Sequence, residues 1–552
     1  MDYEISLAAG GCVLTHAGAS IRTFAITDDF ERAFKLTETI NQLKTATGIN
    51  LYECAKQEGI SFWALYQEEF FWRAVRPVVK YSSVLKWWMD GGQPVVKTTM
   101  QDLASLFAGF ADPAAGRAVP IKRRIVDFAQ ITGILLNNIA ASVVTRFAGT
   151  RVTVFGAVPD VSGANFRLRD LYGELNSRGV RFIHSFAFSG FKTFFRHLFT
   201  SKRLCFYVPH PGRIYTALTR AGVATPIVDF SHAGLAPHEA AAFERLVALF
   251  LTHIECNIRL QGLLRFSLRI LGLKQVVGID DHCAMVGLIP ACKSEGVETI
   301  AMQTGPFRKL NLGWICPGIP REHCTGYDRL LVWSEYWKHL LAGISNVYST
   351  DNLEACGFIR PKSLSLARRT GGPPATPVRL LYAWEFLAEP AEVSEYLTLL
   401  IERGVEVYFK LRPDTPDEEQ LRHLPREKLN LIRTFTPDSL SGFDVCGGTF
   451  TTVMYELYHM GLPLWYFPMS HDYGNFIVRD GIAQEITLSV LRDPSFDAVT
   501  HVSQGNSLRK CVFGDIPAPT YLASFLSRIP FSQSGLKTGH GSPSAPTVRP
   551  VP

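Results

Sequence analysis

The sequence predicts an α/β protein with two facing, doubly wound parallel-sheet domains and a helical N-terminal extension. Three observations lead to this prediction. The chain has 552 residues, which is more than one hydrophobic core usually serves, so two or three domains are expected. Strand-length apolar runs alternate with amphipathic runs from about residue 150, and again from residue 378. Between these blocks, residues 361–377 (PKSLSLARRTGGPPATP) have the Pro, Gly and Ser density of a linker.

Residues 1–120 are expected to form the helical extension. Apolar residues recur there at mixed spacings of three and four, as in the stretch from residue 59 to 92. This stretch also mixes aromatic and basic side chains, among them Trp72, Arg76 and Trp88. Packing on the next domain is the favoured explanation, and contact with the inner face of a membrane is the alternative.

Residues 121–360 are expected to form the first parallel-sheet domain. Buried-strand patterns occur in the order TRVTVFGAV, VRFIHSF, RLCFYVP, LKQVVGIDD and VETIAMQTG, with helical runs such as AMVGLIPACKSEG between them. Strand, helix and strand joined by short loops predict parallel pairing with crossover helices. The basic run IKRR at 121–124 is read as a solvated helix start, and ITGILLNNIAASVV at 131–144 as a core helix too short to span a membrane.

Residues 378–530 are expected to form the second parallel-sheet domain. Its strands read VRLLYAWEF, VEVYFKLRP, LNLIRTF, FDVCGG and LPLWYFP, and AEVSEYLTLLIERG is a helix between them. Residues 531–552 have the composition of a disordered tail.

Composition excludes several functional classes. The formal charge of +6 is small and spread along the chain, so a nucleic-acid partner is not expected. The 11 cysteines form no CxxC or zinc-like pattern, and they fit buried thiols of a reducing cytosol. With no secretory signal and no DxD-type motif, we expect a cytoplasmic protein without metal or other cofactor.

One candidate phosphate site lies in GGTFTTVMYE, residues 447–456, where a predicted strand meets a predicted helix. Gly448 permits close backbone approach, and Thr449, Thr451 and Thr452 place hydroxyls beside the free amides of a helix start. Glu456 lies one turn further along the same face, where a carboxylate suits a ribose diol. The alternative is an ordinary threonine cap after a tight turn.

Two cations end a strand in FKLRPD. Lys410 and Arg412 would share one face of that strand and suit a diphosphate or carboxylate, although an exposed surface pair is the alternative.

In the first domain, Asp281 and His282 follow an apolar strand and could supply a general base. A helix cap near residue 284 is the alternative. Gln303 and Thr304 end the next strand, at the same edge of the predicted sheet.

The ordered set of these stretches, from about residue 273 to 468, resembles bacterial glycosyltransferases of the GT-B architecture that build capsule, lipopolysaccharide or other surface polysaccharides. VVGIDDHCAMVGLIPACKSEGVETIAMQTG is similar to that family's strand, acidic loop, helix and strand, with Thr304 where His is common. FKLRP stands where related enzymes carry a Lys-x-His-Pro motif, with Arg412 in place of His. GGTFTTVMYELYHMGLPLWYFP looks like their donor-site strand, helix start and turn.

The resemblance implies a nucleotide sugar bound by the second domain, with CMP-linked acidic sugars among the candidates, and a glycan or lipid-linked acceptor on the first domain. Lys410, Arg412 and the helix start at Thr451 and Thr452 would hold phosphate, and Glu456 the ribose. A charged guanidinium cannot exchange a proton as His can, so Arg412 suits anion binding and not acid/base work. The alternatives are a nucleotide-sugar epimerase or a glycerophosphotransferase on the same fold, or a non-catalytic scaffold for glycan assembly.

Overall fold

The computed structural model describes the chain except for residues 1–2, 9–10, 27–28, 99, 112–120, 148–151, 156–174, 176, 178–181, 188–204, 209–227, 231–232, 280–286, 308–309, 358–375, 386–387, 389, 413–416, 422, 434–441, 450, 460, 470–475, 504–511 and 513–552. The predicted tail and almost all of the predicted linker therefore lie outside the described residues.

Seven parallel strands form the first large sheet, in the order β13-β12-β11-β10-β7-β8-β9. The chain runs outward from β7 to β9, returns beside β7, and runs outward the other way from β10 to β13. This reversal is the doubly wound order. The strands are β7 (Val152–Phe155), β8 (Phe182–Ala187), β9 (Cys205–Val208), β10 (Gln275–Ile279), β11 (Glu298–Met302), β12 (Arg329–Val332) and β13 (Leu353–Ala355).

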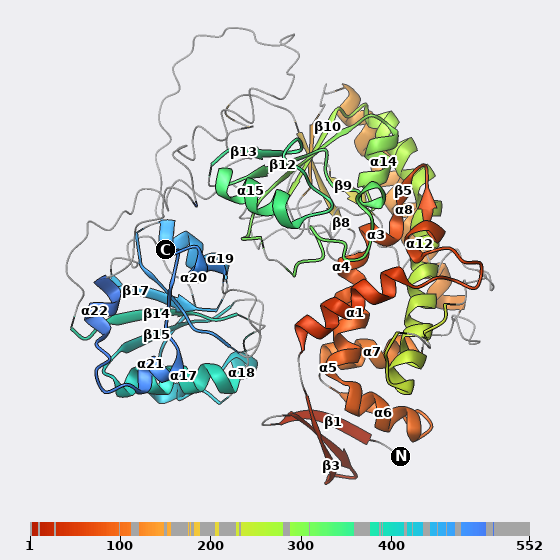
Figure 1. Cartoon of the computed structure of the whole chain (residues 1–552). Coiled ribbons are helices and arrows are strands. Elements are labelled where there is room, and N and C mark those ends of the chain that lie inside the picture. Colours follow the sequence, from red (N-terminus) through yellow and green to blue (C-terminus); the bar gives the residue numbers. More distant parts are fainter. Residues whose placement is uncertain are drawn as a thin grey trace, which may run out of the picture.

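Six parallel strands form the second sheet, in the order β16-β15-β14-β17-β18-β19. The chain again reverses beside its first strand, here between β14 and β17. Figure 1 shows this sheet and its helices as a separate lobe at the lower left, with the first sheet above it. The strands are β14 (Arg379–Ala383), β15 (Glu406–Lys410), β16 (Asn430–Ile432), β17 (Val445–Gly448), β18 (Leu464–Tyr466) and β19 (Gln484–Glu485).

Helices cover both sheets at the places that the alternating pattern predicts. Those of the first lobe are α8 (Ile121–Phe147), α12 (Pro237–Leu271), α14 (Ile289–Ser294) and α15 (Glu335–Ile344). Those of the second lobe are α17 (Pro390–Glu402), α18 (Asp417–Gln420), α19 (Thr452–His459), α20 (Phe476–Arg479), α21 (Leu488–Arg492) and α22 (Ala498–Ser503). The predicted α/β class with two doubly wound parallel sheets is thus confirmed.

The N-terminal region is mainly helical, and it also contains a small sheet that the sequence analysis did not predict. Three antiparallel strands and one parallel strand form a sheet in the order β3-β2-β1-β6. The turn from β2 to β3 places Ala17 and Gly18 at φ 49° and 81°, the left-handed backbone that two-residue hairpins need. The strands are β1 (Tyr3–Ala8), β2 (Gly11–His16), β3 (Ala19–Ala25) and β6 (Val96–Thr98), and the longer helices are α1 (Phe30–Gln42), α6 (Ser82–Asp90) and α7 (Gln101–Ala111). Four short helical segments, α2 (Leu51–Cys54), α3 (Phe62–Leu65), α4 (Gln67–Phe70) and α5 (Arg76–Lys80), lie between α1 and α6, together with a π-helical turn at Phe71–Val75.

Helix α12 joins this region to the first sheet. Phe243 and Phe250, in its first half, lie in the N-terminal core. Leu264 and Leu268, in its second half, lie in the core beneath the first sheet. In Figure 1 the helix runs beside both regions, so one rigid element fixes their relative position.

The aromatic and basic stretch of the N-terminal region packs inward. Trp88 is 5% exposed, and the Arg76 guanidinium lies 5.0 Å from the centre of the Trp72 ring. Trp88 shares its core with Phe243 and Phe250 of α12, in agreement with the favoured explanation of packing.

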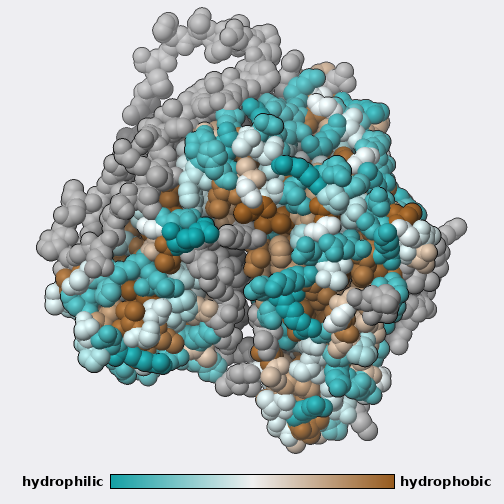
Figure 2. All heavy atoms as spheres, in the orientation of Figure 1, coloured by the Kyte–Doolittle hydropathy of each residue, from teal (hydrophilic) through white to brown (hydrophobic). Residues whose placement is uncertain are grey.

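The two sheet lobes meet through aromatic side chains. Trp333 and Trp337 contact Tyr455 of α19 with ring centroids 6.2 and 5.5 Å apart, and Tyr336 donates a hydrogen bond to Asp480. Trp333, Trp337 and Tyr455 belong to one apolar core that spans both lobes, and Tyr336 packs against it. In Figure 2, hydrophobic residues lie along the boundary between the lobes, next to the position of α15.

Candidate functional site

The reversal between β14 and β17 is the first place to seek a ligand site, because ligands of doubly wound sheets bind beyond the carboxyl ends of the strands at this point. Glu385 follows β14, and Thr449 follows β17 directly. The predicted donor-side residues on β15 and α19 flank the same position.

The two glycines of β17 are required by packing. A β-carbon on Gly447 would lie 2.5 Å from the Phe467 ring, and one on Gly448 would lie 2.8 Å from the Ala383 carbonyl oxygen. Both distances are far below van der Waals contact, so only glycine lets β17 lie this close to β14. The sequence motif therefore has a structural cause, and the predicted ligand contact of Gly448 stays a prediction.

Thr449 is the residue at this edge that points most directly to a ligand. Its side chain is buried, with 7% of the residue exposed, yet its hydroxyl has no hydrogen-bond partner among the described residues. Leaving a buried hydroxyl unsatisfied costs about 1–3 kcal/mol. A ligand oxygen at this strand end would remove that cost.

Helix α19 begins at Thr452, as the motif predicts. The Thr451 carbonyl accepts the Met454 amide at 3.1 Å, which is the first turn of the helix. Thr451, Thr452 and Glu456 are all half-buried, so the structure leaves them accessible at the helix start and first turn. Their contacts with nucleotide remain predictions.

Lys410 and Arg412 flank the buried Leu411, which agrees with the expected alternation of side chains. Lys410 ends β15 and its ammonium donates to the Leu411 carbonyl. Gln420 clamps the Arg412 backbone, accepting its amide at 2.6 Å and donating to its carbonyl at 2.9 Å. The strand end is therefore held rigidly before any ligand arrives.

Glu385 is a site residue that the sequence analysis missed. It is 3% exposed, and its Oε1 lies 3.8 Å from Arg412 Nη1. A buried carboxylate is costly unless it is paired, so this contact orients the guanidinium at the strand end. The signal in the sequence was an acidic residue immediately after the central strand, in VRLLYAWEF.

Gln303 holds the loop that follows β11. Its Oε1 accepts the Trp333 amide at 2.8 Å, and its Nε2 donates to the Gly305 carbonyl at 2.9 Å. The residue is fully buried, so it acts here as a support for the loop. Thr304 is half-buried on that loop, and its predicted acceptor contact stays a prediction.

The loop after β11 reaches the lobe of the second sheet, where the predicted donor-side residues lie. A β-carbon on Gly305 would lie 3.4 Å from Thr452 Oγ1. The structure therefore brings together the carboxyl ends of strands from both sheets, as the sequence analysis expected of facing domains.

Asp281 and His282 lie outside the described residues. Strand β10 ends at Ile279, beside β7 at the reversal of the first sheet. The two residues thus follow the strand that a doubly wound sheet would use, and their catalytic role stays a prediction.

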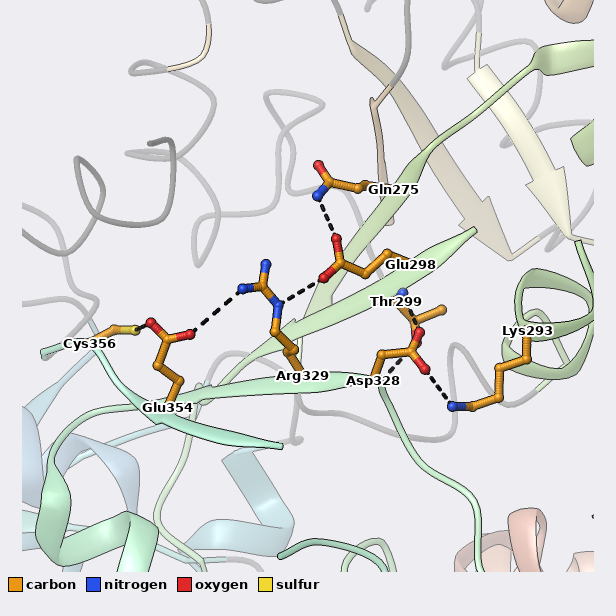
Figure 3. Close-up of polar contacts among 8 residues, drawn as sticks. All are labelled: Gln275, Lys293, Glu298, Thr299, Asp328, Arg329, Glu354 and Cys356. Carbon is orange, nitrogen blue, oxygen red and sulfur yellow. Dashed lines mark hydrogen bonds and ion pairs between the residues drawn. The ribbon is translucent and has the colours of Figure 1, made fainter. Parts of the chain in front are cut away.

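The opposite, amino-terminal edge of the first sheet is closed by polar contacts (Figure 3). Arg329 pairs with Glu298 at 2.9 Å, and Lys293 pairs with Asp328 at 2.6 Å. Burial by itself raises the pKa of Asp328, but Lys293 and the Thr299 donors outweigh it and hold that pKa below its usual value. These ion pairs stabilise the amino-terminal edge of the sheet.

Within the described part of the chain, no cluster of three or more His, Cys, Asp or Glu side chains forms a metal-binding arrangement. No helix there is long and apolar enough to cross a membrane.

No family model matches the sequence, and no curated protein does. Among solved structures, the chain is similar to CalG4, the calicheamicin glycosyltransferase, with 12% identity, a TM-score of 0.41, and coverage of 69% of this chain and 99% of that one. It is similar to UDP-GlcNAc 2-epimerase from Methanocaldococcus jannaschii with 11% identity, a TM-score of 0.40, and coverage of 68% and 99%. It is similar to MurG from Acinetobacter baumannii with 11% identity, a TM-score of 0.36, and coverage of 68% of this chain and 94% of that one. The strand order of the two sheets, rather than these similarities, establishes the fold.

Proposed function

We propose that the protein is a glycosyltransferase that moves a sugar from a nucleotide-activated donor to a cell-surface glycan or lipid-linked acceptor, working in the cytoplasm. A CMP-linked acidic sugar is the candidate donor. The observation that carries the proposal is the buried hydroxyl of Thr449 at the reversal of the second sheet, which has no hydrogen-bond partner in the described part of the chain. It lies at the same sheet edge as the cationic strand end of Lys410 and Arg412.

The donor phosphate would be held by fixed positive charge. The Arg412 guanidinium lies beside Glu385, and Gln420 fixes the Arg412 backbone. The α19 start supplies free amides with a partial positive charge. Such preorganised donors stabilise the charge that develops on a leaving phosphate. Glu456 would receive hydrogen bonds from the ribose.

The acceptor would lie on the side of the first sheet. The loop that Gln303 holds brings Gly305 beside Thr452, so an acceptor hydroxyl on that loop would face the donor. Asp281 or His282 would take the proton of that hydroxyl as the new glycosidic bond forms. The leaving nucleotide carries away the electron pair of the broken bond.

A nucleotide panel tests the donor site. Calorimetry with UDP, GDP, CDP and CMP should give one clearly preferred nucleotide, and absence of binding to all four would favour a non-catalytic scaffold. Radiolabelled donor then tests the reaction. Label arriving on a polymer or lipid supports transfer, whereas a free isomer formed without acceptor supports an epimerase.

Two substitutions test whether the second lobe binds the donor and the first lobe supplies the catalytic base. Thr452→Val should weaken nucleotide affinity by about 1–2 kcal/mol through one lost hydrogen bond. Asp281→Asn should reduce turnover and leave nucleotide affinity nearly unchanged. Equal loss of affinity in both variants would refute the assignment of donor and acceptor sides.

A further inference from the structure

Two buried amide side chains of helix α12 lack a partner for their oxygen atoms. Asn257 is 1% exposed and Gln261 is fully buried. Neither Asn257 Oδ1 nor Gln261 Oε1 has a hydrogen-bond partner among the described residues. Leaving two buried acceptors unsatisfied costs free energy, which a ligand with two hydrogen-bond donors would recover.

The direction of both amides is fixed by backbone carbonyls. Asn257 Nδ2 donates to the His253 carbonyl at 3.0 Å, and Gln261 Nε2 donates to the Gly287 and Asn257 carbonyls at 3.0 and 3.3 Å. Turning either amide over would place its oxygen against a carbonyl oxygen. The pair therefore presents two acceptor atoms, and a ligand there has to donate.

The pair lies at the carboxyl edge of the first sheet. Helix α12 ends at Leu271, and the chain turns back into β10 at Gln275. Gln261 lies about 15 Å back along the helix, and β10 is about 13 Å long, so this side chain is level with the carboxyl end of the strand. Its bond to Gly287, six residues after Asp281 in the sequence, agrees with this placement.

The N-terminal region contributes a third polar group at this place. A β-carbon on Gly287 would lie 3.6 Å from the Tyr66 hydroxyl and 3.9 Å from Asn257 Oδ1, so both oxygens border the same side of Gly287. Tyr66 also packs on α12, with its ring centroid 6.3 Å from that of Phe250. We call Tyr66, Asn257, Gln261 and Gly287 the α12 cluster.

The ligand that suits the α12 cluster is neutral and carries several hydroxyl groups. All four residues of the cluster are uncharged, so a charged group bound there would be buried without a counter-charge, which is costly. Two amide oxygens one helical turn apart, with a rise of about 6 Å, can accept hydrogen bonds from two hydroxyls of one sugar residue. The Tyr66 phenol is able to donate to an oxygen of the same sugar.

We propose that the α12 cluster binds hydroxyl groups of the acceptor sugar, and that the N-terminal region thereby helps to select the acceptor. The inference rests on the proposed glycosyltransferase function and assigns a neutral, hydroxyl-rich sugar to its acceptor side. The N-terminal region also lies against the chain that follows β11, where Asn41 donates to the Pro317 carbonyl at 2.7 Å. It therefore borders the segments after both β10 and β11.

Glycoside binding to the full chain tests the proposal. The probes are the octyl β-glycosides of glucose, galactose and N-acetylglucosamine, titrated by ligand-observed NMR, and the wild type should bind at least one of them. Asn257→Leu removes one acceptor oxygen at nearly constant volume and should weaken that binding about tenfold, as expected for one lost hydrogen bond. Gly287→Ala adds a methyl group in van der Waals contact with the Tyr66 hydroxyl and Asn257 Oδ1, so it should weaken the same binding without unfolding the chain.

Asn138→Leu is the matched control. Asn138 is also buried, but the Tyr207 backbone satisfies both its donor and its acceptor. Its substitution should lower the melting temperature and leave glycoside binding unchanged, whereas Asn257→Leu should keep or raise the melting temperature.

Two results overturn the proposal. One is a wild type that binds none of the glycosides. The other is an Asn257→Leu variant that loses as much stability as Asn138→Leu and binds the glycosides normally, because its oxygen then meets a structural partner such as a buried water. Nucleotide affinity should be the same in every variant. A protein that binds glycosides through Asn257 but binds no nucleotide would refute the proposed function and support the sugar site, so the two failures are distinct.

Discussion

Gly305 and Thr452 meet at the boundary between the two parallel sheets, where a β-carbon on Gly305 would lie 3.4 Å from Thr452 Oγ1. The loop after β11 thus touches the first residue of α19. These two segments are far apart in the sequence, and their contact is what makes a shared site for two substrates geometrically possible.

Gly305→Val tests this contact. The β-carbon itself would already be in van der Waals contact with Thr452 Oγ1, so the two further methyl groups of valine would crowd the space between the lobes. We therefore expect loss of most transfer activity with the fold intact. Nucleotide affinity should fall less than turnover, because the loop belongs to the proposed acceptor side. Equal activity in the variant and the wild type, measured by transfer of labelled sugar, would show that the reacting groups meet elsewhere.

Thr449→Val removes a buried hydroxyl that has no partner among the described residues. The free energy of unfolding should stay the same or rise, because no protein hydrogen bond of the described chain is lost. Nucleotide affinity should fall by about 1–2 kcal/mol, roughly tenfold. Chemical denaturation and calorimetry measure the two quantities.

Thr299→Val is the matched control for Thr449→Val. The Thr299 hydroxyl is fully buried and donates to Asp328 at 2.7 Å. Its loss should lower the free energy of unfolding by about 1–3 kcal/mol and leave nucleotide affinity unchanged. If Thr449→Val behaves in the same way, its hydroxyl has a structural partner and not a ligand.

Gly448→Ala tests the packing role of the strand glycines. The added methyl group would lie 2.8 Å from the Ala383 carbonyl oxygen, so β17 must move away from β14. Overpacking of this kind costs about 1–3 kcal/mol. Gly262→Ala, on α12 with no neighbour within 4 Å, should instead stabilise the protein by about 0.5–1 kcal/mol. Thermal or chemical unfolding of both variants distinguishes backbone packing from a general glycine effect.

Asp328→Asn tests the network of Figure 3 through pH. The fold holds the pKa of Asp328 below its usual value, so its contribution is complete above the ordinary aspartate pKa of about 3.9 and disappears as pH falls through the lowered value. At pH 7 the variant should lose about 1–3 kcal/mol of unfolding free energy.

The loss in Asp328→Asn should shrink in acid, as the wild-type carboxylate becomes protonated. The exposed Asp351 supplies the control, because Asp351→Asn should have little effect at either pH. A destabilisation of Asp328→Asn that is the same at pH 7 and in strong acid would contradict the role of the carboxylate charge.

The sequence by itself determined the two parallel sheets and the carboxyl edges of those sheets as the place of the candidate ligand residues. Alternating strand and helix patterns require parallel pairing, and the strands at residues 379–383 and 445–448 form where VRLLYAWEF and FDVCGG predict them. The GGTFTT junction and the FKLRP strand end then fall at the carboxyl edge of one sheet. Local periodicity carries this information because it depends only on neighbours along the chain.

Only the tertiary structure decided how particular side chains are used. Glu385 reaches Arg412 because β14 and β15 are neighbours, and the glycines of β17 are fixed by Phe467 and Ala383. Gln303 proves to be a buried loop support. None of these contacts is a property of sequence spacing.

Helix α8 shows most clearly why the sequence pattern alone does not decide which side chains are buried. Its pattern of apolar and polar residues predicts a helix but not which face is buried, since that depends on the partner. Here the partner is β9, an edge strand whose backbone groups need hydrogen bonds, so Asn138 is drawn inward. Ile134 and Ala141 are buried on the same side as Asn138, while Phe128 and Leu136 are left facing outward.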